Sequence, residues 1–375
     1  MKTKGAVLWE FHQPWSVEDI EIGDPVRDEV KIQMEASGMC HSDHHLVTGD
    51  MPMLGFPVLG GHEGAGIVTE VGPGVQDLAP GDHVVLSFIP SCGTCPSCRA
   101  GMSNLCDLGA NLLAGLAISD GTHRVHARGK GAYTMTLLGT FSPYVVVHKT
   151  SVVRIAPEIP FEVACLVGCG VTTGYGSATR SANVRPGDDV TVIGVGGVGM
   201  AALQGALNAG ARRVFVVEPV EWKRKAALQF GATKTFPDIT SAIAGIAEAT
   251  HGSMSQKVIV TVGQAQGVDV DNYLAVTAKG GTCVVTAVGN MFSSETKLNL
   301  AMLTLLQKNL QGTIFGGCNP QHDIPLLLSM YQAGRLNLDD MITRQYTLDQ
   351  INEGYQDMLS GKNIRGIIRY TDADR

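Results

Sequence analysis

The sequence predicts an α/β protein with two domains, a β-rich barrel-like domain followed by a doubly wound parallel-sheet domain. The chain has 375 residues, which is long enough for two hydrophobic cores. Short β-type runs separated by Gly and Pro fill about the first 150 residues. From Asp189 onward, strand-type and helix-type segments alternate, which is the pattern of a parallel sheet covered by helices.

The β-rich part is expected to span residues 1–170 and to carry long loops. Its strand-type runs are EVKIQM, AGIVTEV, DHVVLSF and YVVVHKTSVVRI. These runs are short, rich in β-branched residues and separated by Gly and Pro turns, which favours an all-β or barrel-like arrangement.

Four cysteines in one loop, residues 92–106, predict a structural zinc site. Cys92, Cys95, Cys98 and Cys106 read C-x2-C-x2-C-x7-C. Thiolates this close in sequence can converge on one tetrahedral ion, and a closed set of four is typical of structural zinc. The loop is rich in Pro, Ser and Gly, so the ion would replace a hydrophobic core. An iron–sulfur cluster is the alternative, although the seven-residue gap departs from the ferredoxin pattern.

The parallel-sheet part is expected at residues 171–315. Its alternating segments are DVTVIGV, VGMAALQGALNAGA, RRVFVVE, EWKRKAALQFGA, KVIVTVG, GVDVDNYLAVTAKG and GTCVVTAVG. The remaining stretch, 316–375, is short for a core of its own, so we expect it to fold back on the first domain.

A glycine motif opens the parallel-sheet part and predicts a dinucleotide-binding loop. Gly194, Gly196 and Gly199 form G-x-G-x-x-G between a strand and a helix. Such glycines allow a tight turn and a close approach of the backbone, including that of Gly197 and Val198, to a pyrophosphate at the helix N-terminus.

A carboxylate follows the next strand and predicts the choice of cofactor. Glu218 lies nineteen residues after Gly199, where it can accept hydrogen bonds from the ribose hydroxyls of adenosine. It would repel the additional phosphate of NADP, so NAD is the expected cofactor. Lys223 can reach the same ribose or can be a solvated surface lysine.

A second metal site is indicated by residues that lie far apart in the sequence. Cys40, His62 and Cys169 would give three ligands, leaving a fourth position for water or substrate, as in catalytic zinc sites. Asp43 and Glu63 lie close to these ligands in sequence, and a carboxylate there can accept the other ring N–H of His62.

The composition excludes several classes of function. The net charge of −7 argues against a nucleic acid or an anionic membrane as the main partner. The N-terminus lacks a signal-peptide core, and no apolar run approaches the length of a membrane span. Clustered cysteines in such a chain indicate metal ligands in a reducing compartment, so a cytoplasmic protein is expected.

Six motifs in order give a resemblance that covers essentially the whole chain. They are GMCHSD, GHEGAGIVTEVG, the four-cysteine loop, LVGCGVTTGYGSA, GVGGVG and GKNIRGIIRY. The sequence resembles the zinc-dependent medium-chain alcohol dehydrogenases, in a bacterial branch close to class III and to the actinobacterial nitrosodimethylaniline-dependent group. This resemblance implies a GroES-like barrel as catalytic domain, a six-stranded Rossmann sheet as coenzyme domain, and two zinc ions per subunit.

The resemblance also assigns roles to single residues. The known catalytic-zinc ligands of the family, two cysteines and a histidine, match Cys40, His62 and Cys169. Ser42 matches the hydroxyl that takes the substrate proton, and His45 the outer end of that relay at solvent, reached by way of a ribose hydroxyl.

Three further residues match contacts to the cofactor. Thr173 falls near the nicotinamide, and Arg365 matches a contact to the pyrophosphate. His41 replaces the arginine that many relatives place against the pyrophosphate, so its contact would be weaker and dependent on pH.

Four apolar residues match positions that line the alcohol channel in relatives, namely Met51, Phe88, Leu137 and Leu138. An apolar lining favours an uncharged alkyl or aryl group. Class III enzymes carry a carboxylate near the position of Met51, and its absence here departs from a glutathione-type formaldehyde role. The four residues can alternatively be plain core.

The sequence therefore predicts an NAD-dependent zinc enzyme that reversibly oxidises a primary alcohol to an aldehyde. The alternatives are a thiol-adduct formaldehyde dehydrogenase, an aldehyde dismutase with a tightly held cofactor, and a non-enzymatic NAD-binding protein. The expected partner is a small alcohol or aldehyde, without nucleic acid or membrane. We also expect a homo-oligomer, with a dimer favoured over a tetramer.

Overall fold

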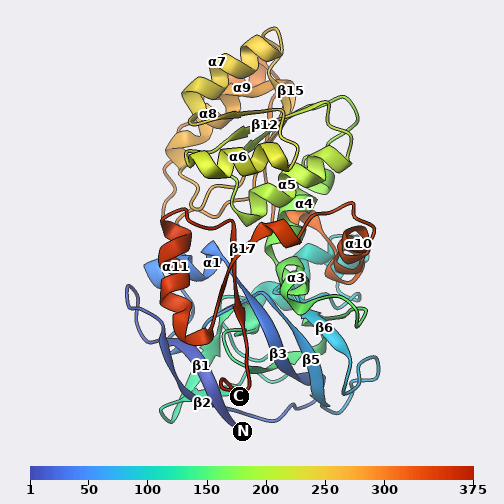
Figure 1. Cartoon of the computed structure of the whole chain (residues 1–375), viewed down its shortest axis with the longest axis vertical. Coiled ribbons are helices and arrows are strands. Elements are labelled where there is room, and N and C mark those ends of the chain that lie inside the picture. The colour runs from blue at the N-terminus through green and yellow to red at the C-terminus, as the bar shows by residue number, and fades with distance from the viewer. The chain divides into compact units, whose positions relative to one another are not determined.

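The computed structural model describes all 375 residues and divides the chain into two compact units (Figure 1). The first unit comprises Met1–Cys169 and Asn319–Arg375, and the second comprises Gly170–Cys318. The sequence placed the corresponding boundaries after residues 170 and 315. No helix combines the length and the apolar character needed to cross a membrane.

The first unit is built on two sheets, in agreement with the predicted barrel-like domain. Its strands are β1 (Lys2–Leu8), β2 (Ser16–Ile22), β3 (Glu29–Met39), β4 (Val58–Leu59), β5 (Gly64–Val71), β6 (His83–Leu86), β7 (Val125–Ala127), β8 (Lys130–Thr134), β9 (Tyr144–His148), β10 (Val152–Arg154), β17 (Ile342–Tyr346) and β18 (Arg365–Arg369). A closed barrel has the order β1-β2-β7-β8-β4, and a seven-stranded sheet has the order β10-β6-β5-β3-β18-β17, with β9 also paired to β3. The run YVVVHKTSVVRI forms two strands, because a 3-10 turn at Lys149–Ser151 interrupts it.

Five helices decorate this unit and help to position the site. They are α1 (His41–Thr48), α2 (Pro96–Arg99), α3 (Phe161–Ala164), α10 (Pro320–Gln332) and α11 (Ile351–Leu359). Helix α1 begins directly after β3 and ends at Gly49, whose φ of 76° is the left-handed conformation that glycine adopts without strain. Helices α1 and α11 lie side by side (Figure 1), and the rings of His44 and Tyr355 stack between them.

The second unit is a six-stranded parallel sheet with covering helices, as predicted. Its strands are β11 (Asp189–Ile193), β12 (Arg213–Val217), β13 (Lys234–Phe236), β14 (Ser255–Val260), β15 (Thr277–Val285) and β16 (Asn309–Gly312), in the order β13-β12-β11-β14-β15-β16. Its helices are α4 (Gly170–Gly176), α5 (Gly197–Asn208), α6 (Glu221–Gln229), α7 (Ile239–Ala249), α8 (Val270–Ala275) and α9 (Leu300–Leu305). Strand β11 is buried at every residue, including Asp189 and Thr191, as expected for a central strand of a parallel sheet that is covered on both faces.

Candidate metal centres and nucleotide loop

The four loop cysteines converge, as their spacing predicts. Their four Sγ atoms all lie within 4.8 Å of one another. Cys95 caps helix α2, with its Sγ accepting a hydrogen bond from the backbone N–H of Cys98 at 3.4 Å. The backbone N–H of Cys95 points to Cys92 Sγ at 3.3 Å, and that of Asp107 points to Cys95 Sγ at 3.5 Å. Backbone donors aimed at sulfur favour thiolates, so this cluster suits a closed tetrahedral zinc site.

A second cluster lies deep in the first unit and gathers residues from three parts of the chain. Cys40 stands between β3 and α1, His62 between β4 and β5, and Cys169 at the end of the unit's first stretch. Their ligand atoms, together with a carboxylate oxygen of Glu63, lie within 4.8 Å of one another, and all four residues are buried. The structure thus brings together the three residues predicted for the catalytic metal.

His62 is oriented by Asp43 and presents its other nitrogen to the cluster. Its Nδ1 lies 3.0 Å from Asp43 Oδ1, which also accepts the backbone N–H of Gly61 at 3.1 Å. His62 Nε2 is buried and has no hydrogen-bond partner in the protein. A buried ring nitrogen without a partner, facing two cysteine sulfurs, fits a zinc ligand.

Glu63 has a different position from the one proposed for it. The sequence offered Asp43 and Glu63 as alternative acceptors for the N–H of His62, and the structure gives that place to Asp43. Glu63 instead contributes an oxygen to the ligand cluster, while its Oε2 accepts a hydrogen bond from Arg365 on β18. Both side chains are buried, so the guanidinium compensates the carboxylate charge.

The electrostatics of the cluster favour a thiolate beside a partnered imidazole. A hydrogen bond with Cys169 and the nearby His62 hold the pKa of Cys40 well below its usual range, although burial opposes this shift. Burial acts to lower the pKa of His62, but the charge and hydrogen bond of Asp43 raise it to about 10. The same groups, the Asp43 carboxylate and the Cys40 thiolate, would attract a zinc ion bound at His62 in place of a proton.

The two residues of the predicted relay both lie on helix α1. Ser42 Oγ lies 3.7 Å from Cys40 Sγ, so the hydroxyl is next to the metal cluster. His45 is buried instead of lying at solvent, and its Nδ1 is 3.3 Å from Asp50 Oδ2. Thr48 Oγ1 donates to the same oxygen at 2.6 Å. Asp50 was missed in the sequence because it stands beyond the end of the helix, outside any motif.

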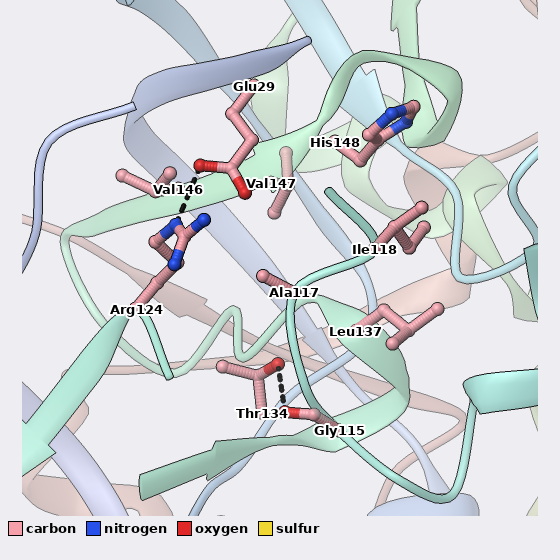
Figure 2. A pocket seen from close by; sticks show the side chains of 10 residues that line it. All are labelled: Glu29, Gly115, Ala117, Ile118, Arg124, Thr134, Leu137, Val146, Val147 and His148. Carbon is pink, nitrogen blue, oxygen red and sulfur yellow. Dashed lines mark hydrogen bonds and ion pairs between the residues drawn. The ribbon is translucent and has the colours of Figure 1, made fainter. Parts of the chain in front are cut away.

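Three of the four proposed pocket residues share one hydrophobic core, and the fourth, Leu137, lines a hollow. The Phe88 ring meets His62 edge-on, with centroids 5.7 Å apart, and Met51 packs against the core of the unit. Leu138 is part of that core. Leu137 lines a separate hollow with Glu29, Arg124 and His148 that contains none of the metal ligands (Figure 2).

The hollow around Leu137 is a structural feature of the loop that precedes β7. Figure 2 shows Arg124 pointing at Glu29, and their Nε and Oε2 atoms are 2.7 Å apart. Leu137 itself adopts a φ of 69°, in a turn after β8 that directs its side chain into this hollow. The alternative of plain core, which the sequence left open, fits both Leu137 and Leu138, and their place in a substrate channel stays a prediction.

The glycine loop of the second unit has the geometry of a phosphate-binding turn. Gly194 ends β11 with a φ of 89°, and Gly196 caps helix α5. A Cβ at Gly199 would lie 1.9 Å from the Gly194 oxygen, so a side chain there is excluded, whereas a Cβ at Gly196 would meet nothing within 4 Å. The open space at Gly196 leaves room for a ligand at the helix N-terminus, next to Gly197 and Val198 in the first turn of α5.

Glu218 is fixed beside this loop. Its Oε2 accepts the backbone N–H of Val195 at 3.0 Å and its Oε1 accepts that of Val220 at 3.0 Å. Each carboxylate oxygen can accept a second hydrogen bond, so a ribose can still bind there. Lys223 is buried, not solvated; burial lowers its pKa while the charge of Glu218 acts in the opposite direction.

The remaining predicted cofactor contacts are placed as follows. Thr173 lies in α4, and its Oγ1 is buried without a hydrogen-bond partner. His41 opens α1, and burial, helped by the charge of His45, lowers its pKa to about 4. His41 is therefore neutral near pH 7 in this structure. Arg365 is held by Glu63, and its Nε has no partner.

Comparisons with known proteins agree with this construction. Residues 26–158 match the alcohol dehydrogenase GroES-like domain, and residues 197–333 match the zinc-binding dehydrogenase family. The chain is 75% identical to alcohol dehydrogenase B of Mycobacterium tuberculosis over 375 residues, which is 100% of both chains. It is 47% identical to an NDMA-dependent alcohol dehydrogenase of Amycolatopsis methanolica, over 99% of this chain and 100% of that one.

Solved structures give the same fold. An alcohol dehydrogenase zinc-binding domain protein from Burkholderia ambifaria superposes with a TM-score of 0.91 at 30% identity, covering 99% of each chain. The benzyl alcohol dehydrogenase of Acinetobacter calcoaceticus gives a TM-score of 0.91 at 26% identity, covering 99% of this chain and 100% of that one.

Proposed function

The chain belongs to the zinc-binding alcohol dehydrogenase family of oxidoreductases, and we propose that it reversibly oxidises a primary alcohol to an aldehyde with NAD as hydride acceptor. The observation that carries this proposal is the convergence of Cys40, His62 and Cys169, with His62 Nε2 unpartnered. Glu63 is the fourth member of this cluster and is held by Arg365, so we infer that the alcohol oxygen takes the fourth position of the ion while the carboxylate stays with the guanidinium.

We propose two zinc ions per subunit, one in each cluster. The loop cluster offers four sulfurs and no open position, so it serves stability. In the buried cluster, bound zinc would supply a Lewis acid that makes the alcohol hydroxyl more acidic.

The chain's own residues then orient the alcohol and move its proton. Ser42 Oγ, next to Cys40, takes the hydroxyl proton. His45 receives it further along helix α1, and Asp50 is the outer group of the relay. The Asp50 side chain is 14% exposed against 3% for His45, so Asp50 is the member that reaches water.

The alcohol is expected to be uncharged and apolar. Phe88 stands edge-on to His62, and Met51 is partly buried at the same core. An aryl or alkyl group suits such a lining. The similarity to a benzyl alcohol dehydrogenase, at 26% identity, supports an aryl alcohol as the first substrate to test.

NAD is proposed over NADP because Glu218 is fixed beside the glycine loop by two backbone N–H groups. A rigid carboxylate there would repel a 2′-phosphate. The kcat/KM with NAD should therefore exceed that with NADP by about a hundredfold or more. Glu218→Ala should reduce this ratio. Equal use of both cofactors by the unaltered protein would contradict this assignment.

The proposed function is tested on the purified full chain. The protein is unfolded, and zinc per chain and any released nicotinamide are measured. Benzyl alcohol is then assayed with added NAD. Two zinc ions and NADH formation are expected. Nicotinamide that is released only on unfolding, and does not exchange with added NAD, would favour the alternative of an aldehyde dismutase with a tightly held cofactor. The similarity to an NDMA-dependent alcohol dehydrogenase is the reason to test this alternative. Turnover of formaldehyde that requires a host thiol would favour the thiol-adduct alternative.

We further propose a homodimer formed through strand β16 in the reducing cytoplasm. Strand β16 pairs only with β15, and all four of its residues are exposed, as are Leu305, Leu310 and Ile314. An exposed edge strand with apolar side chains can pair with a second copy. Leu310→Lys should shift the sedimentation coefficient to that of a monomer, whereas an unchanged coefficient would exclude this interface. None of the nine cysteines forms a disulfide, which suits a reducing compartment.

A further inference from the structure

Two buried polar atoms of the first unit lack partners and belong to neighbouring residues. Asp43 uses Oδ1 for His62 and for the backbone of Gly61, but its Oδ2 has no hydrogen-bond partner. The hydroxyl of Tyr355 on α11 is also buried without a partner. Buried polar atoms are almost always hydrogen-bonded, so a pair of such atoms requires an explanation.

The ring of Tyr355 lies next to α1, the helix that carries Asp43. It packs against Trp15 and Phe141, each with centroids 6.3 Å away, and stacks on His44 at 6.5 Å. His44 is the residue after Asp43. Burial raises the pKa of Tyr355 well above its usual value, and the charges of Asp43 and Cys40 add to this shift. Independently of this shift, the stacking on His44 places the buried, unpartnered Tyr355 hydroxyl beside the helix whose Asp43 Oδ2 also lacks a partner.

We propose that Tyr355 is a positioning residue for the buried metal site: its hydroxyl donates to Asp43 Oδ2 and thereby fixes the carboxylate that orients His62. The chain of contacts runs from Tyr355 to Asp43, then to His62 Nδ1, and leaves Nε2 as the ligand atom. Groups that orient a metal-bound histidine in this way strengthen metal binding. The inference rests on the proposed function, since it requires a metal on Cys40, His62 and Cys169.

The test compares two substitutions that each remove one buried hydroxyl and keep the ring. Tyr355→Phe removes the proposed donor. Tyr370→Phe is the matched control, because Tyr370 is equally buried in the same unit but its hydroxyl bonds to Ser37 and to the backbone oxygen of Thr140. Zinc transfer to a chromogenic chelator is followed for the full chain, and Cys169→Ser identifies the ion of the buried site.

In Tyr355→Phe we expect the affinity of the buried site for zinc to fall by roughly ten- to a hundredfold, with the loop zinc unchanged. The d–d absorption of the cobalt-substituted protein should shift, because the ring of His62 is less well fixed. Tyr370→Phe should leave both the zinc affinity and the cobalt spectrum unchanged, even if its thermal stability falls. Replacing Tyr355 with p-aminophenylalanine, which returns an N–H donor to the same place, should restore the affinity.

A double-substitution cycle with Asp43→Asn separates positioning from packing. If Tyr355 acts through Asp43, adding Tyr355→Phe to Asp43→Asn should cause no further loss of zinc affinity. Unchanged affinity in Tyr355→Phe, or a loss that adds in full to that of Asp43→Asn, would overturn the proposal. If Cys169→Ser removes no zinc, the metal is not bound at this site, and the proposed function fails together with the inference.

Discussion

The two cysteine-rich sites of the first unit differ in how the chain builds them. The loop site takes four sulfurs from fifteen consecutive residues, held by local turns and backbone N–H groups, and three of these cysteines are partly exposed. The buried site gathers Cys40, His62, Glu63 and Cys169 from three separate stretches of the chain, and all four residues are buried. Asp43 and Arg365 hold residues of this buried site from outside the ligand set.

This difference shows what each site can do. A closed set of like ligands on a short loop stabilises that loop but offers no place for a substrate. A mixed set of sulfur and nitrogen ligands, assembled by the whole unit and surrounded by buried polar partners, provides an open position and control over proton transfer. The four predictions below are arranged from the largest expected effect on catalysis to the smallest.

Loss of a ligand at the buried site should have the largest effect. Cys169→Ser should lower kcat/KM for benzyl alcohol by at least about a thousandfold, because a Lewis acid contributes several kcal/mol to such a reaction. Zinc content should fall from two ions to one while the circular dichroism spectrum stays the same. Cys165→Ser, at a buried thiol outside the cluster, is the control and should keep activity. Full activity in Cys169→Ser would remove the functional distinction between the sites.

The proton relay should give the next largest effect. His45→Ala should keep both zinc ions but slow alcohol oxidation below about pH 8 by roughly ten- to a thousandfold. Ser42→Ala should be slower still and should not recover at high pH, because Ser42 lies beside Cys40 at the inner end of the relay. The measurement is a pH–rate profile between about pH 6 and 9. A His45→Ala profile that overlays that of the unaltered enzyme would exclude the relay.

The loop site should affect stability more than turnover. Cys98→Ser should remove one zinc ion and lower the melting temperature by roughly 5–10 °C, while the remaining folded protein keeps most of its kcat. Differential scanning fluorimetry and metal analysis at one protein concentration give both quantities. Unchanged stability and metal content in Cys98→Ser would show that the loop does not hold a structural ion.

The smallest effect concerns thiol reactivity after zinc has been removed. Burial acts to raise the pKa of Cys92, but hydrogen bonds from Thr94 and the backbone lower it to about 6. Its thiolate is therefore present above pH 6, so alkylation by iodoacetamide should rise between pH 5 and 7 and then level off. Burial raises the pKa of Cys106 to about 12, so that thiol should stay unlabelled at pH 7. Thr94→Val should move the Cys92 midpoint upward; an unchanged midpoint would exclude the role of Thr94.

Local features were accessible from the sequence because their geometry depends on neighbouring residues. The four loop cysteines and the turn at Gly194 and Gly199 are set by spacing and by backbone conformation over a few residues. The six-stranded sheet was likewise predicted by alternating segments, since each strand and its following helix carry their own pattern.

The tertiary structure decided which side chains face the site. Asp43 and Glu63 both lie next to a ligand in sequence, yet only Asp43 meets His62, because Glu63 is drawn to an arginine 302 residues away. Leu137 lines a hollow beside Glu29 and Arg124, because it lies in a turn with a φ of 69°. Tyr355 belongs to no motif, and its ring stacks on His44, the neighbour of Asp43, only because the C-terminal stretch of the first unit packs against its N-terminal stretch. The sequence by itself determined the folds of the two units and the cysteines and histidine proposed as metal ligands, because these depend on local patterns and motifs. Long-range packing determined which side chains surround those residues.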